Sequence, residues 1–271
     1  MKYLELTLPT PQENLACDEV LLDFCEEGYD HEILRFWEHR EPFVVLGYSN
    51  KARAEANLNA ARWANVPVLR RCTGGGAVVQ GPGCLNFSLI LRIPDSGPLA
   101  GVTETNIHIM NRHKDALAPL LKGEHRAWRA EGGVQSSVIN SQPSGVSPRP
   151  SSLVSAVCVQ GHSDLTLGDL KFSGNAQRRK RRSLLFHGTF LLGTDIELIE
   201  RVLPMPSRQP AYRRHRRHHD FLTNVDIQRR AITEALKNSW HANEPLKEIP
   251  VDKIAALTAS RYASDEWTFK F

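Results

Sequence analysis

RRCTGGGAVV, residues 70–79, places three consecutive glycines between two apolar segments of the chain. Because glycine has no Cβ, the backbone N–H groups of such a turn can closely approach a phosphate or a carboxylate. The Arg71 guanidinium can form two parallel hydrogen bonds to the same anion. The run lacks the GKS or GKT of a P-loop and the GxGxxG spacing of a dinucleotide fold. Spacing alone therefore supports an anion site and an ordinary turn equally.

Around this run, helix-like and strand-like segments alternate, which is typical of an α/β domain. Apolar spacing predicts helices over residues 14–27, 51–63, 102–121, 196–202, 225–240 and 251–262. Short apolar runs predict strands over residues 33–37, 43–46, 68–71, 84–92, 165–167, 171–172 and 184–192. Residues 131–155 are rich in Ser, Pro and Gly, so we expect a surface insertion there that carries no active residue.

Length and composition predict one globular, cytoplasmic protein. The 271 residues, 41% of them hydrophobic, suffice for a substantial core. The first twenty residues lack the pattern of a signal peptide, and no run reaches the roughly 18 apolar residues of a membrane span. The five cysteines show neither CxxC nor zinc-type Cys/His spacing, so we expect reduced thiols and no metal site formed directly by a protein motif.

Several motifs, taken together, resemble the lipoate-protein ligase A family of the biotin/lipoate A/B protein ligase superfamily, which includes lipoyl and octanoyl transferases. The run RRCTGGGAVVQGPGCLNFSL is similar to the family signature of a twin arginine, Ser or Thr, three glycines and Ala-Val. The other similar motifs follow in order: NLA with DE at 14–19, FVVLGYSN at 43–50, GHSDL at 161–165, KFSGNA at 171–176, HGT at 187–189 and EWTF at 266–269. One departure is Gln80, which stands where several members have a histidine.

The resemblance implies an α/β (α+β) fold, in which helices flank a mixed, largely antiparallel sheet of the biotin/lipoate ligase type. It implies that residues 1–271 form one catalytic domain, interrupted by the insertion at 131–155 and without the C-terminal accessory domain of the bacterial ligases. In some relatives that accessory piece is a separate polypeptide, so such a polypeptide is one expected partner.

The resemblance also implies the residues of an active site. Those expected to hold the acyl-adenylate and ATP are Arg71, Thr73, Gly74, Gly75, Gly76, Ala77, Val78, Val79, Lys171, Ser173, Gly174 and Asn175. Those expected to form the acyl pocket are Phe87, His187, Gly188 and Thr189. We expect Lys171, at the end of a short strand and before a turn at residues 173–175, to bridge the carbonyl and the phosphate and to stabilise the oxyanion.

Residue type alone leaves alternatives open at several of these positions. Most lysines are solvated surface groups, and the apolar side chains of Val78, Val79 and Phe87 suit either an acyl tunnel or plain core. His187 lies in an apolar strand, where a histidine is as often hydrogen-bonded core as a base. We expect it to shape the loop beneath the acyl chain.

The function implied is attachment of a lipoyl group to a lysine of lipoyl carrier domains through an acyl-adenylate. The carriers are the E2 subunits of 2-oxoacid dehydrogenases and the glycine cleavage H protein. ATP and Mg²⁺ would be needed, lipoate or octanoate would be the substrate, and no tightly bound cofactor is expected. The alternative is an ATP-independent octanoyl or lipoyl transferase, which would take its acyl group from an acyl carrier protein and hold it on Cys158, thirteen residues before Lys171. A binder of lipoate without transfer activity is a further alternative.

Two basic clusters, at residues 178–182 and 213–217, raise a rival from another class, a nucleic-acid-binding module. No aromatic residue interrupts either cluster, whereas single-strand binders normally place stacking platforms among their basic residues. We therefore favour solvated loops, or docking of the acidic carrier domains, over nucleic acid as a partner.

Overall fold

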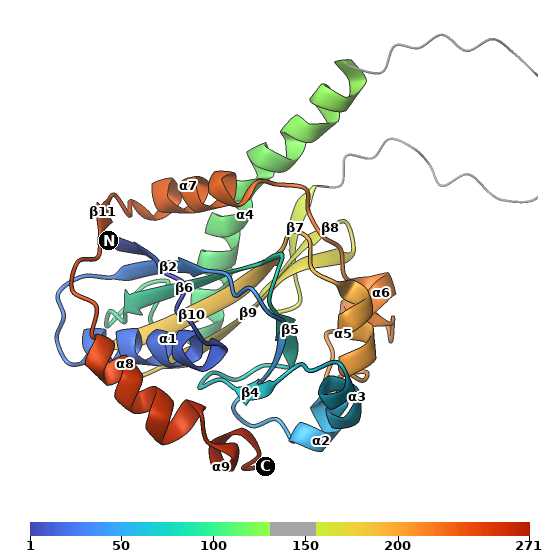
Figure 1. The fold of residues 1–271 in the computed structure, drawn as a ribbon. Helices are drawn as coiled ribbons and strands as arrows, with labels where there is room; N and C mark the ends of the chain where they lie inside the picture. The colour runs from blue at the N-terminus through green and yellow to red at the C-terminus, as the bar shows by residue number, and fades with distance from the viewer. Residues whose placement is uncertain (131–155) are drawn as a thin grey trace, which may run out of the picture.

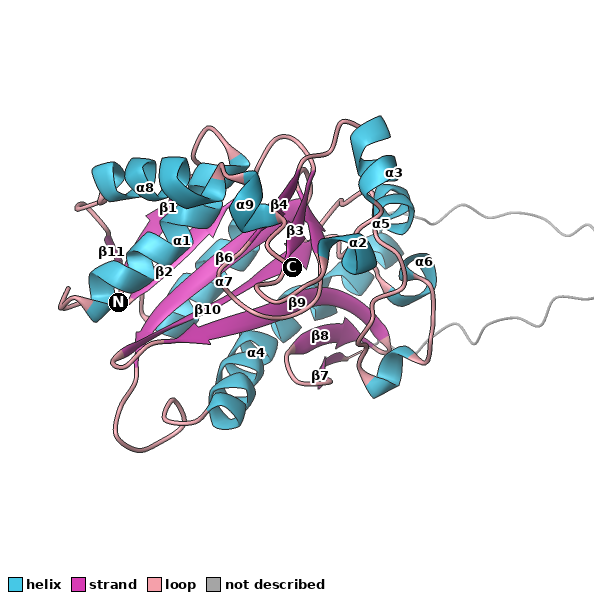
Figure 2. Ribbon diagram, turned by 90° about the horizontal axis from the view of Figure 1, so that it is seen from below, coloured by secondary structure: helices cyan, strands magenta, loops and turns pink. Residues whose placement is uncertain are grey.

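The computed structural model describes residues 1–130 and 156–271, and the side chains of 122–130 are not part of that description. The insertion predicted at 131–155 lies outside the described residues. In the part described, a large mixed sheet is covered by helices on both faces (Figures 1 and 2). The predicted fold class is confirmed.

The large sheet has eight strands in the order β11-β1-β2-β6-β10-β9-β8-β7. The pairs β11–β1 and β1–β2 are parallel, and every other pair is antiparallel. The strands are β1 (Lys2–Glu5), β2 (Ile33–Trp37), β6 (Cys84–Arg92), β7 (Val157–Gln160), β8 (Asp164–Leu167), β9 (Leu170–Arg179), β10 (Ser183–Leu191) and β11 (Glu244–Pro245).

A second sheet of three strands carries the glycine turn. Its order is β4-β3-β5, with β3 (Phe43–Leu46) between β4 (Val68–Arg70) and β5 (Val78–Gln80). The segment at 71–77 connects β4 to β5, so the turn is held at both ends by strands that pair with β3.

Some helices cover the two faces of the large sheet and others pack against the small sheet. The helix bounds are α1 (Pro11–Glu26), α2 (Ala52–Glu55), α3 (Leu58–Trp63), α4 (Val102–Ala130), α5 (Ile196–Val202), α6 (His218–Phe221), α7 (Arg229–Trp240), α8 (Val251–Leu257) and α9 (Asp265–Thr268), with a 3-10 turn at Ala211–Arg213 and a π-helical turn, η2, at Thr258–Tyr262. One apolar core lies between the sheet and α4 and α7. A second lies between the opposite face, α1, α8 and the small sheet, and a third lies between the small sheet and α2, α3 and α5. No described helix is both long enough and apolar enough to cross a lipid bilayer.

Alternation of side chains along the central strands separates these faces chemically. On β10, Phe186 and Phe190 enter the core beneath α4, whereas Leu185 packs toward α1. His187 and Thr189, which alternate with them, therefore lie on the α1 face, beside the small sheet. The α1 face thus carries the polar residues of β10.

The structure corrects several predicted elements. The helix predicted over residues 51–63 is two helices, because Asn57 caps α3 by accepting a hydrogen bond from the N–H of Ala60 and so starts a new helix. The two-residue strand predicted at 171–172 is the ten-residue β9. The expected turn at 173–175 is therefore wrong, because these residues pair with β10 and, at Ser173, also with β8.

Candidate functional site

The glycine turn is shaped by close contacts with the strand before it. Gly75 has φ +90°, a conformation open mainly to glycine. A Cβ on Gly47, just after β3, would lie 2.1 Å from the Gly75 carbonyl oxygen, so both positions need glycine for the segments to meet. In contrast, a Cβ on Gly74 or Gly76 would meet no protein atom within 4 Å. The turn is therefore closely packed against the protein at Gly75 and open at Gly74 and Gly76.

Arg71 holds the turn from inside. Its Nη2 donates to the carbonyl oxygens of Gly74 at 2.6 Å and Gly76 at 2.9 Å, and its Nε donates to Thr73 Oγ1 at 2.9 Å. The sequence suggested that the Arg71 guanidinium could bind an anion through two parallel hydrogen bonds. In the structure, its N–H groups are instead bonded to the turn itself. Its guanidinium therefore fixes the backbone conformation of the turn.

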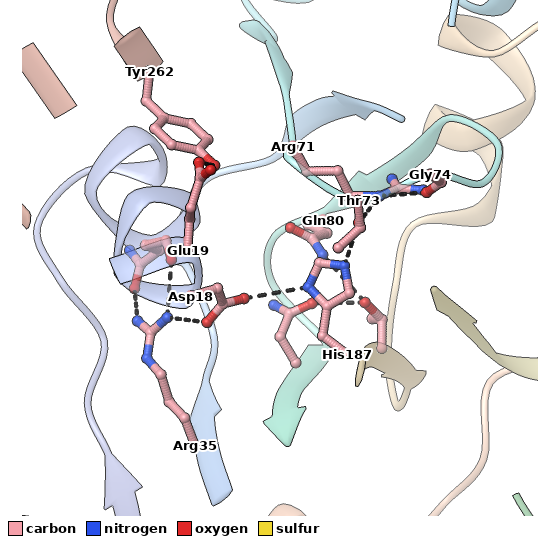
Figure 3. A network of polar contacts seen from close by, with 12 residues as sticks. Asp18, Glu19, Arg35, Arg71, Thr73, Gly74, Gln80, His187 and Tyr262 are labelled. Atoms are coloured by element: carbon pink, nitrogen blue, oxygen red, sulfur yellow. Dashed lines mark hydrogen bonds and ion pairs between the residues drawn. The ribbon is translucent and has the colours of Figure 1, made fainter. Parts of the chain in front are cut away.

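A buried chain of polar groups links the turn to α1 (Figure 3). His187 Nε2 lies 2.7 Å from Thr73 Oγ1, and His187 Nδ1 lies 3.3 Å from Asp18 Oδ2. The other carboxylate oxygen of Asp18 accepts from Arg35 Nη1 at 2.6 Å. Burial acts to raise the pKa of Asp18, but the Arg35 charge and the hydrogen bond and charge of His187 outweigh it and leave the pKa below its ordinary value. Asp18 is therefore an ionised, acceptor-only group inside the protein.

Lys171 reaches the same face of the sheet because of a β-bulge. Thr166 of β8 pairs with Lys171 and Leu165 pairs with Ser173, so Phe172 is an extra residue in β9. Phe172 enters the core under α4. The bulge places Lys171 on the same side as Gly174, and a Cβ on Gly174 would lie 2.7 Å from Lys171 Nζ.

The Lys171 ammonium is held by a carboxylate and is not free in solvent. Its Nζ lies 2.9 Å from Asp164 Oδ1, and the lysine side chain is 24% exposed. The other oxygen of Asp164 accepts from the Tyr212 hydroxyl at 2.7 Å. Burial and the neighbouring Asp164 charge raise the pKa of Tyr212, which therefore stays a donor.

The turn and Lys171 meet over two positions of β9. A Cβ on Gly75 would lie 3.6 Å from Ala176 Cβ, and Gly174, the next residue on that face, is the one that Lys171 covers. Ala176 pairs with His187 and Gly174 with Thr189, so all four lie on the α1 face. Two motifs about a hundred residues apart in sequence are thus brought together.

A cavity of about 280 Å³ opens beside the turn. Its lining residues come from the segment after β3, from the turn and from β9: Tyr48, Ser49, Cys72, Thr73, Gly74, Gln177 and Arg178. Small-molecule sites commonly have volumes of about 300 Å³ upward, so this cavity is at the lower end of that range. In the described part of the chain, no cluster of three His, Cys, Asp or Glu side chains could hold a metal ion.

Other expected site residues occupy different places. Thr189 lies on the site face, where its hydroxyl donates to Asn86 Oδ1 at 2.7 Å and accepts from Gln80 Nε2 at 3.3 Å. Gln80 thus makes its polar contact through an amide. Val78 packs toward α1, whereas Ala77 and Val79 belong to a separate core with α2, α3 and α5.

Phe87 and Gly188 are not brought to the turn. They pair with each other across β6 and β10 and lie on the α4 face, where the Phe87 ring stacks on Phe190 with centroids 5.2 Å apart. The strand alternation that puts His187 on one face puts Gly188 on the other. Phe87 is therefore core, a correction to its expected place in the acyl pocket. Ser173 and Asn175 face the α4 side as well, because they alternate with Gly174.

Cys158 lies in register with Lys171, two strands away. It pairs with Thr166, which pairs with Lys171, while its neighbour Val157 enters the core under α4. Adjacent strands are about 4.8 Å apart, so the two Cα atoms are separated by roughly 10 Å. The half-buried thiol donates to the carbonyl of Ala156 at 3.4 Å. It shares the site face, and within the described part of the chain it forms no hydrogen bond with a basic side chain.

The basic clusters are largely paired within the protein. Arg178 bonds Glu19 at 2.9 Å, Arg179 donates to the carbonyl oxygens of Leu99 and Ala100, and Lys180 pairs with Asp23. In the second cluster, Arg213 lies over the Phe221 ring, Arg216 pairs with Asp169, and Arg217 pairs with Glu200. These contacts support the preference against a nucleic-acid surface.

Sequence reasoning did not assign a role to Asp18, Arg35 or Asp164. Asp18 and Asp164 stand inside motifs that resembled the family, at 14–19 and 161–165, and this was the signal available. Arg35 gave none, because a single arginine in an apolar strand reads as an outward-facing residue.

Comparison with known proteins identifies the family of the chain. The family model of the lipoyl protein ligase A/B catalytic domain matches residues 10–232. The chain belongs to this family. Among its relatives, the octanoyltransferase LipM of Lysinibacillus sphaericus is 27% identical and aligns over 96% of this chain and 95% of its own. The lipoate-protein ligase A subunit 1 of Thermoplasma acidophilum is 26% identical over 97% of this chain and 94% of its own.

Solved structures of the family share the fold. A bipartite lipoate-protein ligase from T. acidophilum, studied with its E2 lipoyl domain, superposes with a TM-score of 0.70 at 22% identity and covers 99% of this chain and 95% of its own. A lipoate-protein ligase A bound with ATP gives a TM-score of 0.66 at 24% identity and covers 99% of both chains. The protein is thus an enzyme of the lipoate ligase or octanoyl transferase type.

Proposed function

We propose that the protein activates lipoate or octanoate as an acyl-adenylate and transfers the acyl group to a lysine of a lipoyl carrier domain. One observation carries this proposal: the glycine turn, at Gly75, and the Lys171 ammonium lie over neighbouring positions, Ala176 and Gly174, of one face of β9. An array of backbone donors and a cation on one face suit an activated carbonyl joined to a phosphate.

The reaction has two balanced steps. The carboxylate of the fatty acid attacks the α-phosphorus of ATP and pyrophosphate leaves, which produces the acyl-adenylate. The neutral amine of the carrier lysine then attacks the carbonyl carbon, AMP departs with the C–O bonding pair, and the amine proton is released. In this scheme Lys171 neutralises charge on the phosphate and on the developing oxyanion, and Asp164 keeps the ammonium in place beforehand.

The residues present fit such a ligand. The empty space above Gly74 and Gly76 admits phosphate oxygens without meeting a side chain, and the adjoining cavity extends the site toward Tyr48 and Ser49. Mg²⁺ would be held mainly through the phosphates, since the described residues offer no ready cluster of ligands.

The relatives support lipoyl domains as partners. A ligase of this fold has been solved with ATP, and the T. acidophilum ligase consists of two parts and acts with an E2 lipoyl domain. By analogy, the acceptors proposed here are lipoyl domains of E2 subunits and the glycine cleavage H protein, and a separate accessory polypeptide is a candidate second subunit.

The test is the mass of an apo carrier domain after incubation with the protein, lipoate and ATP·Mg²⁺, with and without the accessory polypeptide. We expect a lipoyl mass gain that requires ATP. Lys171→Ala should lower the rate by roughly 10²- to 10³-fold, the cost of losing one oxyanion donor. Lys253→Ala is the matched control, because Lys253 of α8 lies away from the turn and forms an exposed ion pair with Glu27. Full activity of Lys171→Ala would refute the assignment of Lys171.

A second candidate, ATP-independent octanoyl transfer through Cys158, is favoured by two observations. Several relatives are named octanoyltransferase, and Cys158 shares a face and a strand register with Lys171. Burial raises the pKa of the thiols of Cys17 and Cys84 to about 11 and that of Cys25 and Cys72 to about 12, which argues against these four as nucleophiles near neutral pH.

This candidate predicts an octanoyl mass on the carrier when octanoyl-acyl carrier protein replaces lipoate and ATP. The acyl group would pass to the Cys158 sulfur as a thioester, with the carrier thiol leaving, and then to the acceptor amine. Cys158→Ala should abolish this activity, whereas Cys84→Ala should keep it. If ATP is required and Cys158→Ala is as active as the natural protein, the transferase candidate fails and the ligase stands.

A further inference from the structure

With a neutral His187 imidazole, the buried chain of polar groups between α1 and the glycine turn has one consistent arrangement of protons. Asp18 is ionised and can only accept, so His187 Nδ1 must carry the hydrogen that it shares with Asp18 Oδ2 at 3.3 Å. In a neutral imidazole, His187 Nε2 is then an acceptor, and the donor within reach is the Thr73 hydroxyl at 2.7 Å.

Arg71 fixes the other side of the same hydroxyl. Its Nε–H donates to Thr73 Oγ1 at 2.9 Å, which fills a lone pair of that oxygen while the hydroxyl hydrogen points to His187. The same guanidinium holds the carbonyl oxygens of Gly74 and Gly76. The chain therefore runs from Arg35 and Asp18 through His187 and Thr73 to the backbone of the turn (Figure 3).

We propose that Asp18 and His187 are positioning residues that set the Thr73 hydroxyl, and through Thr73 and Arg71 the conformation of the substrate-binding turn. Their order, carboxylate, imidazole and hydroxyl, is that of a nucleophile triad, but Thr73 is only 1% exposed and its oxygen is already held by Arg71. The hydroxyl holds the turn in one conformation through its two hydrogen bonds and does not attack the acyl group. For its kinetic readout this inference rests on the proposed acyl transfer.

The first test is the tautomer of His187, which needs no turnover. In ¹⁵N-histidine NMR spectra, with the His187 signals assigned by their absence in His187→Gln, we expect the Nδ1–H tautomer. In Asp18→Asn, the new amide oxygen should accept the hydrogen bond from Arg35 Nη1, so the amide NH₂ group faces the imidazole. Because that NH₂ group can only donate, His187 Nδ1 must accept and the imidazole proton moves to Nε2. A natural protein with the Nε2–H tautomer, or Asp18→Asn with an unchanged tautomer, would overturn the inference.

The second test is a matched pair at the hydroxyl itself. Thr73→Val keeps the shape but leaves His187 Nε2 and Arg71 Nε without their shared partner, and we expect kcat/KM for acyl transfer to fall by roughly ten- to a hundred-fold. Thr73→Ser restores the hydroxyl and should stay within a few-fold of the natural protein. Equal rates for the two variants, or an acyl ester found on Thr73 by peptide mass, would overturn the positioning role.

The two tests separate this inference from the proposed function. If no acyl transfer occurs with any donor while the tautomers behave as expected, the proposed function fails, but the positioning role of Asp18 and His187 is still supported. If Asp18→Asn does not fold, the Thr73 pair, which changes no buried charge, still decides the question.

Discussion

At the scale of single residues, the absence of a side chain is as important as its presence. Gly74 and Gly76 leave open space beside the turn, whereas Gly75 and Gly47 are required for two segments of the chain to pass each other closely. The fold therefore requires glycine at one position of the triplet, and we propose that the positions on each side of it leave room for the ligand.

This division predicts different outcomes for alanine at three glycines. Gly74→Ala meets no protein atom and should leave the thermal midpoint unchanged, but its methyl group occupies the ligand space, so the rate of acyl transfer should fall. Gly193→Ala also meets no atom within 4 Å and lies outside the site, so it should change neither quantity. Gly75→Ala, at φ +90° and 2.8 Å from Arg71 Nη2, should lower the stability by about 1 kcal/mol or more.

Differential scanning fluorimetry and the carrier-mass assay give the two readouts. An unaltered transfer rate in Gly74→Ala would show that the ligand does not use the open side of the turn.

At the scale of elements, the sequence predicted what depends on local chemistry. The helix α1 could be anticipated from its apolar spacing, and α5 was predicted with its observed bounds. Most of β9 could not be predicted, because Ser173, Gly174 and Asn175 have weak strand preference and are held there by partners on β10. Only the pairing partners, remote in sequence, decide that this segment is a strand.

The site was predictable to a similar degree. The turn and Lys171 were found because their motifs resemble a family, whereas the roles of Asp18 and Arg35 depend on burial. A charge in a helix or strand normally faces water, and nothing local marks one that does not.

A buried histidine between α4 and α7 predicts how the stability of the protein depends on pH. His113 of α4 is fully buried, and its Nε2 accepts from Trp240 Nε1 at 2.9 Å. Burial, aided by the charge of Arg112, lowers the pKa of His113 from 6.5 to about 3. The unfolded chain therefore takes up this proton first, so the stability contributed by neutral His113 is complete above pH 6.5 and is lost as the pH falls toward 3.

Between pH 6 and pH 4 this group should contribute a loss of about 1.4 kcal/mol per pH unit to the free energy of unfolding. His113→Gln keeps an acceptor for Trp240 and removes the titration, so its stability should depend less on pH. Urea unfolding at pH 7, 6 and 5 gives both slopes, and identical slopes would contradict the assignment.

At the scale of the whole molecule, buried polar groups join the C-terminal segment to the site. Glu19 accepts from Arg178 of β9 and Arg261 of η2, both at 2.9 Å, and from the Tyr262 hydroxyl at 2.7 Å. Arg70, at the end of β4, donates to the carbonyl oxygens of Trp267 and Thr268. The last residues of the chain are thus part of the wall that holds the turn.

Removing the central carboxylate should loosen this segment. We expect Glu19→Gln to lower the free energy of unfolding by about 2 kcal/mol, since Tyr262 and two arginines lose a charged acceptor. Hydrogen exchange should speed up mainly over residues 258–271. Glu244→Gln is the control, because that exposed partner of Lys2 should cause no measurable change. Equal exchange in both variants would argue that Glu19 does not anchor the segment.

Asp18 and Glu19 are neighbours on α1, yet one reaches the imidazole under the turn and the other the C-terminal segment. Successive residues of an α-helix are rotated by about 100°, so the azimuth of α1 about its own axis fixes both contacts simultaneously. A single residue inserted or deleted between the helix cap at Thr10 and Asp18 would rotate the rest of the helix. Both carboxylates would then point away from their partners. The length of that first stretch of helix is therefore as strictly constrained as the identity of the acidic pair itself.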